Sequence, residues 1–180
     1  MQIQTVARGF LAWELTSSAF KVGLVGGAGT FSMLSLSLIG GTFADRISKQ
    51  RVMTFGQIIA TIVPTIVAFL LYTDQLIWQH LFFASIVQGA AWAFIVPSRQ
   101  SMIPDLVGKK LLSNAISLNG AGFSITILIG PIIGGILYEY IGPFGSYCSV
   151  VALCLSSLIC TRLINVNTHN YEESRPTKRF

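Results

Sequence analysis

The chain has 180 residues, of which 52% are hydrophobic and 11% are charged, and its formal net charge is +5. Charged residues make up about a quarter of an ordinary soluble domain, so this composition argues against a soluble globular protein. The basic excess lies in short segments between apolar runs, which relates it to membrane topology and argues against a nucleic-acid partner.

Five runs without Asp, Glu, Lys or Arg follow one another along the chain: 22–44, 52–73, 75–98, 111–138 and 140–161. About 20 helical residues at ~1.5 Å rise cross a ~30 Å hydrocarbon core, so each run is long enough to span a membrane. None shows the charged face of an amphipathic soluble helix. Residues 1–13 are too few to span and contain Arg8. We therefore expect helix 1 to be truncated, with Met1 an internal methionine of a longer protein.

The predicted fold class is an all-α polytopic membrane protein. A transmembrane bundle is expected over residues 1–165, and a polar tail or the start of an interdomain linker over 166–180. The expected helices are 1–13 (partial), 22–44, 52–72, 77–98, 112–138 and 145–163. The three cysteines recur every six residues in the last helix, at Cys148, Cys154 and Cys160. Because this spacing spreads them around a helix, we expect buried apolar residues and no metal site.

The connectors alternate in charge. Ten of the 12 Lys and Arg residues lie in the segments 46–51, 99–110 and 162–179. The positive-inside rule places these segments and the tail in the cytoplasm. We expect the protein to be a multi-pass protein of the plasma (inner) membrane. Six aromatic residues cluster at the opposite boundary and predict an outer aromatic belt: Trp13, Trp78, Tyr138, Tyr140, Phe144 and Tyr147.

The first connector carries a compact motif, Gly-Gly-Thr-Phe-Ala-Asp-Arg-Ile-Ser-Lys-Gln-Arg over residues 40–51. Asp45 ends a helix where the carbonyl dipoles are already negative, so it requires a cation or another helix N-terminus nearby. The segment resembles the loop between helices two and three of the major facilitator superfamily. That resemblance implies a conformational latch between two transporter halves, formed by Gly41, Asp45, Arg46, Lys49 and Arg51. An ordinary basic turn that sets topology is the alternative.

A second motif, Gly-Pro-Ile-Ile-Gly-Gly, occupies residues 130–135 of the fifth expected helix. Pro131 lacks an N–H and predicts a kink, and Gly130 with Gly134 forms a face for close helix packing. With Gly135, the run resembles the fifth-helix signature of major facilitator antiporters, except that Thr126 replaces its first glycine. The resemblance implies a role at the interface of the halves, and plain packing is equally open.

Polar residues inside the expected spans are candidates for a substrate cavity. Gln88 and Asn119 fall on helices that line the central cavity in the family, Trp92 lies one turn from Gln88, and Arg8 is the charge in an apolar segment. Hydrogen bonding between helices is the alternative for the uncharged residues, and snorkelling for Arg8. In the fourth helix, Ser85 stands where the resembling Arg-x-x-Gln-Gly pattern has its arginine.

Together these motifs resemble the drug-exporter branch of the superfamily over residues 1–162. The resemblance implies the N-terminal six-helix half of a secondary transporter that exports small hydrophobic or amphipathic molecules by alternating access. Its expected partners are the lipid bilayer, the small-molecule substrate and a missing C-terminal six-helix half. We expect no enzyme activity, catalytic residue, cofactor or nucleic acid. The alternatives are a nutrient or sugar importer of the same fold and a non-transporting membrane scaffold.

Overall fold

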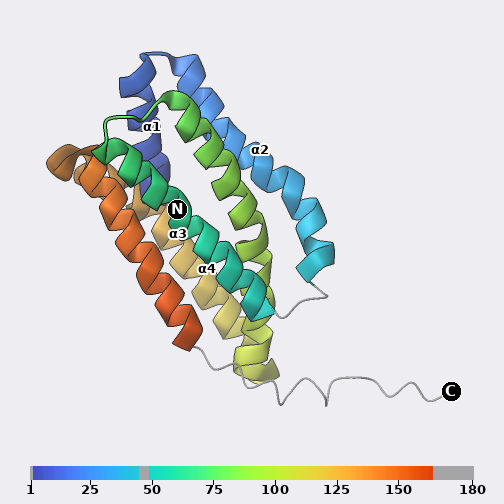
Figure 1. Cartoon of the computed structure of the whole chain (residues 1–180). Coiled ribbons are helices and arrows are strands. Elements are labelled where there is room, and N and C mark those ends of the chain that lie inside the picture. The colour runs from blue at the N-terminus through green and yellow to red at the C-terminus, as the bar shows by residue number, and fades with distance from the viewer. Residues whose placement is uncertain (1, 45–48, 164–180) are drawn as a thin grey trace.

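The structure, a computed structural model, describes residues 2–44 and 49–163, and these residues form helices and no strand. The helices are α1 (Gln2–Thr16), α2 (Ala19–Ala44), α3 (Lys49–Tyr72) and α4 (Trp78–Leu163), arranged as a bundle (Figure 1). Four stretches within them are long and apolar enough to cross a membrane: Ala19–Ser37, Lys49–Tyr72, Trp78–Pro104 and Leu111–Leu163. The prediction of an all-α membrane protein is confirmed.

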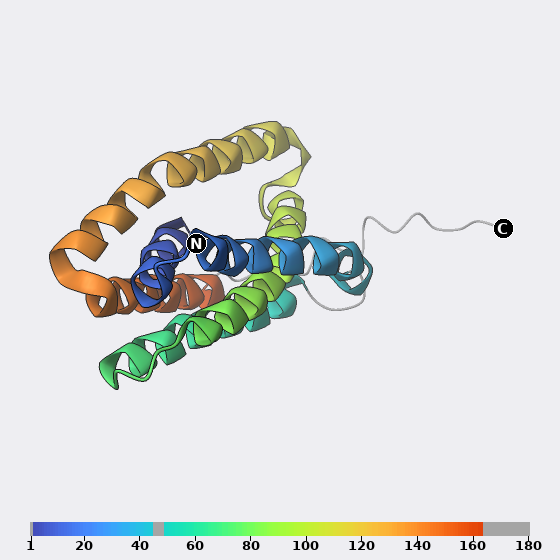
Figure 2. The same cartoon turned by 90° about the horizontal axis from the view of Figure 1, so that it is seen from above.

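Helix α4 is one hydrogen-bonded helix of 86 residues that changes direction. A straight helix of that length would measure about 130 Å, far more than the bundle can accommodate. Instead it folds back on itself, so that its green, olive and orange parts run separately (Figure 2). Gly142, with φ +69°, marks the later bend, because this left-handed backbone favours glycine. We call residues 78–104, 111–141 and 143–163 the first, second and third arms of α4.

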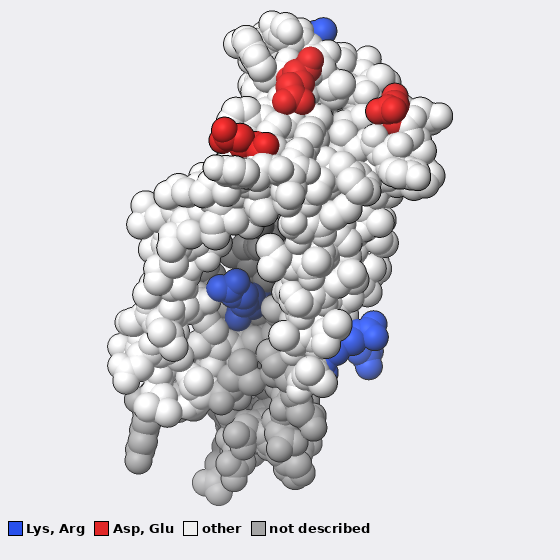
Figure 3. Space-filling model, turned by 90° about the vertical axis from the view of Figure 1, so that its left-hand side faces the viewer, with Lys and Arg blue, Asp and Glu red and all other residues white. Residues whose placement is uncertain are grey.

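Tight turns join α1 to α2 and α3 to α4. Ser17 and Asp74 have φ 47° and 54°, a left-handed conformation that short polar side chains tolerate. The Ser17 N–H donates to the Trp13 carbonyl oxygen at 2.7 Å and so satisfies an acceptor at the end of α1. Acidic side chains gather at one end of the molecule (Figure 3). Glu14 lies in the last turn of α1, and Asp74 lies in the turn between α3 and α4.

The main core joins all four helices. It contains Ala7 and Leu11 of α1, Val25 of α2, Val67 of α3 and Leu81 of α4, together with four more buried residues: Ala12, Ala68, Leu76 and Tyr147. Tyr147 is fully buried, so its predicted place in an outer aromatic belt is wrong. The reason is the turn at Gly142, after which the third arm directs this ring into the core.

Helix α2 crosses the first arm with their backbones in direct contact. A methyl group on Gly89 would overlap the Gly29 carbonyl oxygen, and one on Gly29 would lie 3.1 Å from the Ser85 carbonyl oxygen. One turn further along, the Ser32 hydroxyl donates to the Ile86 carbonyl oxygen at 2.9 Å. Small residues that let helix backbones approach are a principal source of helix association in membranes, so this crossing holds α2 in place.

A polar contact ties α3 to the third arm. The Gln57 side-chain amide donates to the Thr161 hydroxyl at 3.0 Å and to the Ser157 hydroxyl at 3.3 Å. Gln57 is a polar residue inside an apolar span, and its side chain hydrogen-bonds between two helices. Such bonds contribute about 0.6 kcal/mol on average in a membrane protein, so this contact orients the third arm more than it stabilises it.

Candidate functional site: a polar cavity lined by an arginine

A polar cavity of about 450 Å³ lies between α1, α2 and the first arm of α4. Its walls combine small and apolar residues of α2 with polar side chains of α1 and the first arm. The lining residues are Gln2, Gln4, Thr5, Arg8, Gly9, Val22, Val25, Gly26, Gly29, Thr30, Ser85, Gln88 and Gly89. Figure 3 shows the hollow on one face of the molecule, with basic atoms inside it. Arg8 is the charged residue among those that line the cavity.

Arg8 is positioned by helix α1 and by a serine of the first arm. One terminal nitrogen (Nη1) of its guanidinium donates to the Ser85 hydroxyl at 2.8 Å. That hydroxyl in turn donates to the Leu81 carbonyl oxygen at 2.9 Å, which fixes its orientation. Ser85 is fully buried. Ser85 occupies the position at which the Arg-x-x-Gln-Gly pattern has its arginine. A guanidinium thus lies beside that position, although α1 and not the first arm supplies it.

Several polar atoms at this cavity are buried and have no hydrogen-bond partner among the residues that the structure describes. They are the Gln4 Nε2, the Arg8 Nε and the Gln88 Oε1 atoms. Gln4 is 2% exposed and Gln88 is 5% exposed, so both side chains are buried inside the bundle. Unpaired buried polar atoms are costly, and in native proteins they commonly indicate a ligand or water site.

Tyr147 completes the surroundings of Arg8. Its ring belongs to the third arm, and its hydroxyl lies within electrostatic reach of the guanidinium. The hydroxyl is buried and makes no hydrogen bond in the described part of the chain. The cavity therefore presents donors and neutral hydroxyl groups, and no described carboxylate lines it.

Two other predicted cavity residues lie elsewhere. Trp92 packs against Ala60, Ala91 and Ile95, between α3 and the first arm. Asn119 accepts a hydrogen bond of 2.6 Å from Arg99, which connects the second arm to the first. Neither is among the residues that line the polar cavity. Of the four predicted residues, the structure thus brings Arg8 and Gln88 together.

The predicted latch is only partly within the described residues. Asp45 and Arg46 lie outside them. Gly41 falls in the last turn of α2. Lys49 begins α3, and its ammonium group donates to the Ser101 carbonyl oxygen at 3.0 Å. Arg51 lines a shallow cavity that also includes Arg162.

The fifth-helix motif packs against α1. A methyl group on Gly134 would lie 3.0 Å from the Ile3 Cα and 3.1 Å from its carbonyl oxygen, and one on Gly130 would meet the Gln2 side chain. A methyl group on Gly135 would meet nothing within 4 Å. Pro131 lies within the second arm. Gly130 and Gly134 of this motif therefore let α1, the helix that carries Gln4 and Arg8, pack closely against the second arm.

Sequence reasoning missed Gln4, although a signal was available. Gln4 precedes Arg8 by four residues, so the two side chains share one face of α1.

The expected burial of the cysteines is wrong, since Cys148 and Cys160 are exposed and Cys154 is half-buried. The reason is that the third arm keeps an open face on this chain.

The chain belongs to the major facilitator superfamily. A family model described as a transmembrane secretion effector matches residues 1–180. The multidrug efflux pump Tap of Mycolicibacterium fortuitum is 26% identical over 163 residues, which are 87% of this chain and 40% of Tap. The staphyloferrin A transporter of Staphylococcus aureus is 27% identical over 148 residues, 81% of this chain and 37% of that transporter. Multidrug resistance protein 1 of Bacillus subtilis is 28% identical over 126 residues, 70% of this chain and 31% of the relative. The chain thus spans well under half the length of these relatives.

Proposed function

We propose that this chain forms the N-terminal half of a secondary transporter that exports small hydrophobic or amphipathic molecules. The observation that carries the proposal is the polar cavity at Arg8 and Gln88, enclosed by helices of membrane-spanning length. Intramembrane charged residues are costly and usually mark a substrate or ion pathway. The names of two relatives describe drug efflux or resistance, which favours export over import.

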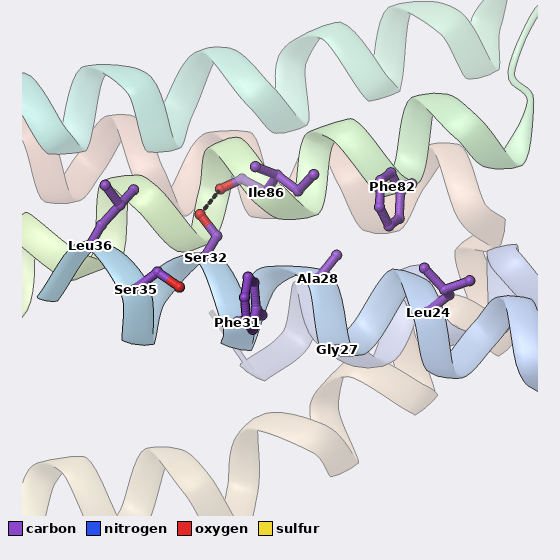
Figure 4. Close-up of a pocket in the computed structure, with 9 residues that line it drawn as sticks. All are labelled: Leu24, Gly27, Ala28, Phe31, Ser32, Ser35, Leu36, Phe82 and Ile86. Atoms are coloured by element: carbon purple, nitrogen blue, oxygen red, sulfur yellow. Dashed lines mark hydrogen bonds between the residues drawn. The ribbon is translucent and has the colours of Figure 1, made fainter.

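A second six-helix half is the proposed partner. In the most apolar stretch of α2 and in that of residues 111–163, 11% of the residues are buried. The corresponding share is 44% in α3 and in the first arm of α4. The exposed side of α2 borders an apolar groove of about 670 Å³ (Figure 4), lined by Leu24, Gly27, Ala28, Phe31, Ser32, Ser35, Leu36, Phe82 and Ile86. Lipid and a second helical half both suit such surfaces, and alternating access requires a second half that rocks against this one.

The proposed orientation places the tail and the segments around Lys49 and Arg99 in the cytoplasm of a plasma (inner) membrane. The turns at Ser17, Asp74 and Gly142 then face the opposite side. Lys21, at that end, lies 5.3 Å from the centre of the Trp78 ring, as suits an interfacial aromatic residue.

Export is tested by accumulation. Cells that express the full-length protein are expected to hold several-fold less of at least one dye, from a panel of anionic, neutral and cationic amphipathic dyes, than cells with an empty vector. Dissipating the proton and sodium gradients together is expected to remove the difference, because a secondary transporter depends on an ion gradient. Equal accumulation across a chemically varied panel of amphipathic dyes would reject export.

The latch is tested by Asp45→Asn in the full-length transporter. We expect flux to fall by roughly tenfold, because an ionic contact that stabilises one conformation contributes on the order of 1–3 kcal/mol. Membrane insertion, measured by the amount of protein in the membrane fraction, is expected to persist. Unchanged flux would reduce the motif to a signal for topology. Asp74→Asn, in the turn between α3 and α4, is the matched control.

A further inference from the structure

The charge of Arg8 has no counter-ion in the described part of the chain. Its guanidinium donates a hydrogen bond to the neutral Ser85 hydroxyl and lies within polar reach of the neutral Tyr147 hydroxyl, and its Nε–H is buried without a described partner. An arginine serving only to pack helices would satisfy its donors on neighbouring carbonyl or hydroxyl groups. This one lines a cavity and keeps an unpaired donor at the cavity wall.

The neighbouring unpaired atoms define what the cavity accepts. The Gln4 amide, one helical turn from Arg8 on the same face of α1, presents a second unpaired N–H donor. Two donors held by one helix and a positive charge match an anion with two oxygen atoms, which arginine binds in a bidentate manner. Val22 and Val25 supply an apolar wall beside them.

We propose that the Arg8 cavity binds the carboxylate of amphipathic cargo, with Arg8 and Gln4 donating to its oxygens and Gln88 accepting from a neighbouring polar group. The inference rests on the proposed transport function and names its substrate class. Cationic cargo is disfavoured because no described carboxylate lines the cavity, whereas a guanidinium does.

The experiment measures binding and is independent of transport. The full-length protein is placed in phosphatidylcholine nanodiscs, which contain no anionic lipid headgroup, and is titrated with three aromatic probes of matched shape. These are naphthoate, its neutral amide, and naphthylmethylammonium. We expect naphthoate to bind about tenfold more tightly than the amide, as one or two charge-assisted hydrogen bonds predict, and the ammonium probe to bind most weakly.

Variants assign the preference to the cavity. Arg8→Gln is expected to make the affinities for naphthoate and its amide equal. Lys21→Gln, which removes a positive charge outside the cavity, is the matched control and should keep the preference. If Arg8→Gln fails to fold in a thermal scan, Arg8→Lys and Gln4→Met replace it. Each of these is expected to reduce the preference several-fold, because one of the paired donors is lost.

Three results would overturn the proposal: a preference for the ammonium probe, no binding of naphthoate, or a carboxylate preference that survives Arg8→Gln. Retained export of cationic dyes alongside any of these results would leave the proposed transport function standing. Loss of export together with intact carboxylate binding would instead reject transport and keep the binding site.

Discussion

Gly89→Ala is expected to lower the stability of the folded protein by about 3 kcal/mol, although it adds a single methyl group. That methyl group would overlap the Gly29 carbonyl oxygen, which is backbone and has no rotamer through which to move away. The two helices would have to separate along their whole crossing, and the hydrogen bond from Ser32 to Ile86 would be lost with them. The expected fall in apparent Tm is about 6–12 °C, measured by tryptophan fluorescence in detergent.

The control for this substitution is Gly120→Ala on the second arm, where an added methyl group meets nothing within 4 Å. Alanine is the better helix former, so this variant is expected to be as stable as the parent or more stable by up to about 1 kcal/mol. Equal destabilisation by the two alanines would show that the close crossing at Gly89 is not what holds α2 to the first arm.

Gly134→Leu is expected to displace α1 and to reduce flux to near background. The Cβ atom of a side chain at this position would lie 3.0 Å from the Ile3 Cα, so the three further carbon atoms of leucine have no room unless α1 moves away. Overpacking of this kind costs about 3 kcal/mol or more. Because α1 carries Gln4 and Arg8, its displacement also opens the polar cavity.

The matched control is the next residue, Gly135→Leu, whose side chain would point into open space in this chain. Thermal stability of the two leucine variants is compared first, and dye accumulation second. We expect the stability loss to be confined to Gly134→Leu. If Gly135→Leu were equally unstable, the contact between the second arm and α1 would not explain the requirement for glycine in this motif.

The membrane class and the family were predictable from the sequence because they depend on one-dimensional patterns. Long uncharged runs indicate spans, and the segment at residues 40–51 carries a recognisable order of residues. Gln88 and Arg8 were identified as intramembrane polar residues in the same way. Asn119 met the same criterion for a cavity residue, yet in the structure it accepts a hydrogen bond from Arg99 and lies outside the cavity.

Which polar residues meet could not be predicted, because helix pairing depends on contacts between residues far apart in the chain. Arg8 and Ser85 are separated by 77 positions, and Gln57 and Thr161 by 104. The close approach of Gly29 to Gly89 selects one crossing of α2 among many that the glycine-rich α2 would permit. The direction of the third arm, and with it the burial of Tyr147, depends on a single left-handed residue, Gly142.

The amino-acid sequence by itself determined that this protein is helical, lies in a membrane and belongs to a transporter superfamily, because hydropathy and local motifs act over one turn or one span. Only the tertiary structure decided that an arginine of α1, a glutamine one turn before it and a glutamine of the first arm share one cavity. The physical reason is that backbone contact at small residues, rather than hydropathy, sets how spanning helices cross in a membrane.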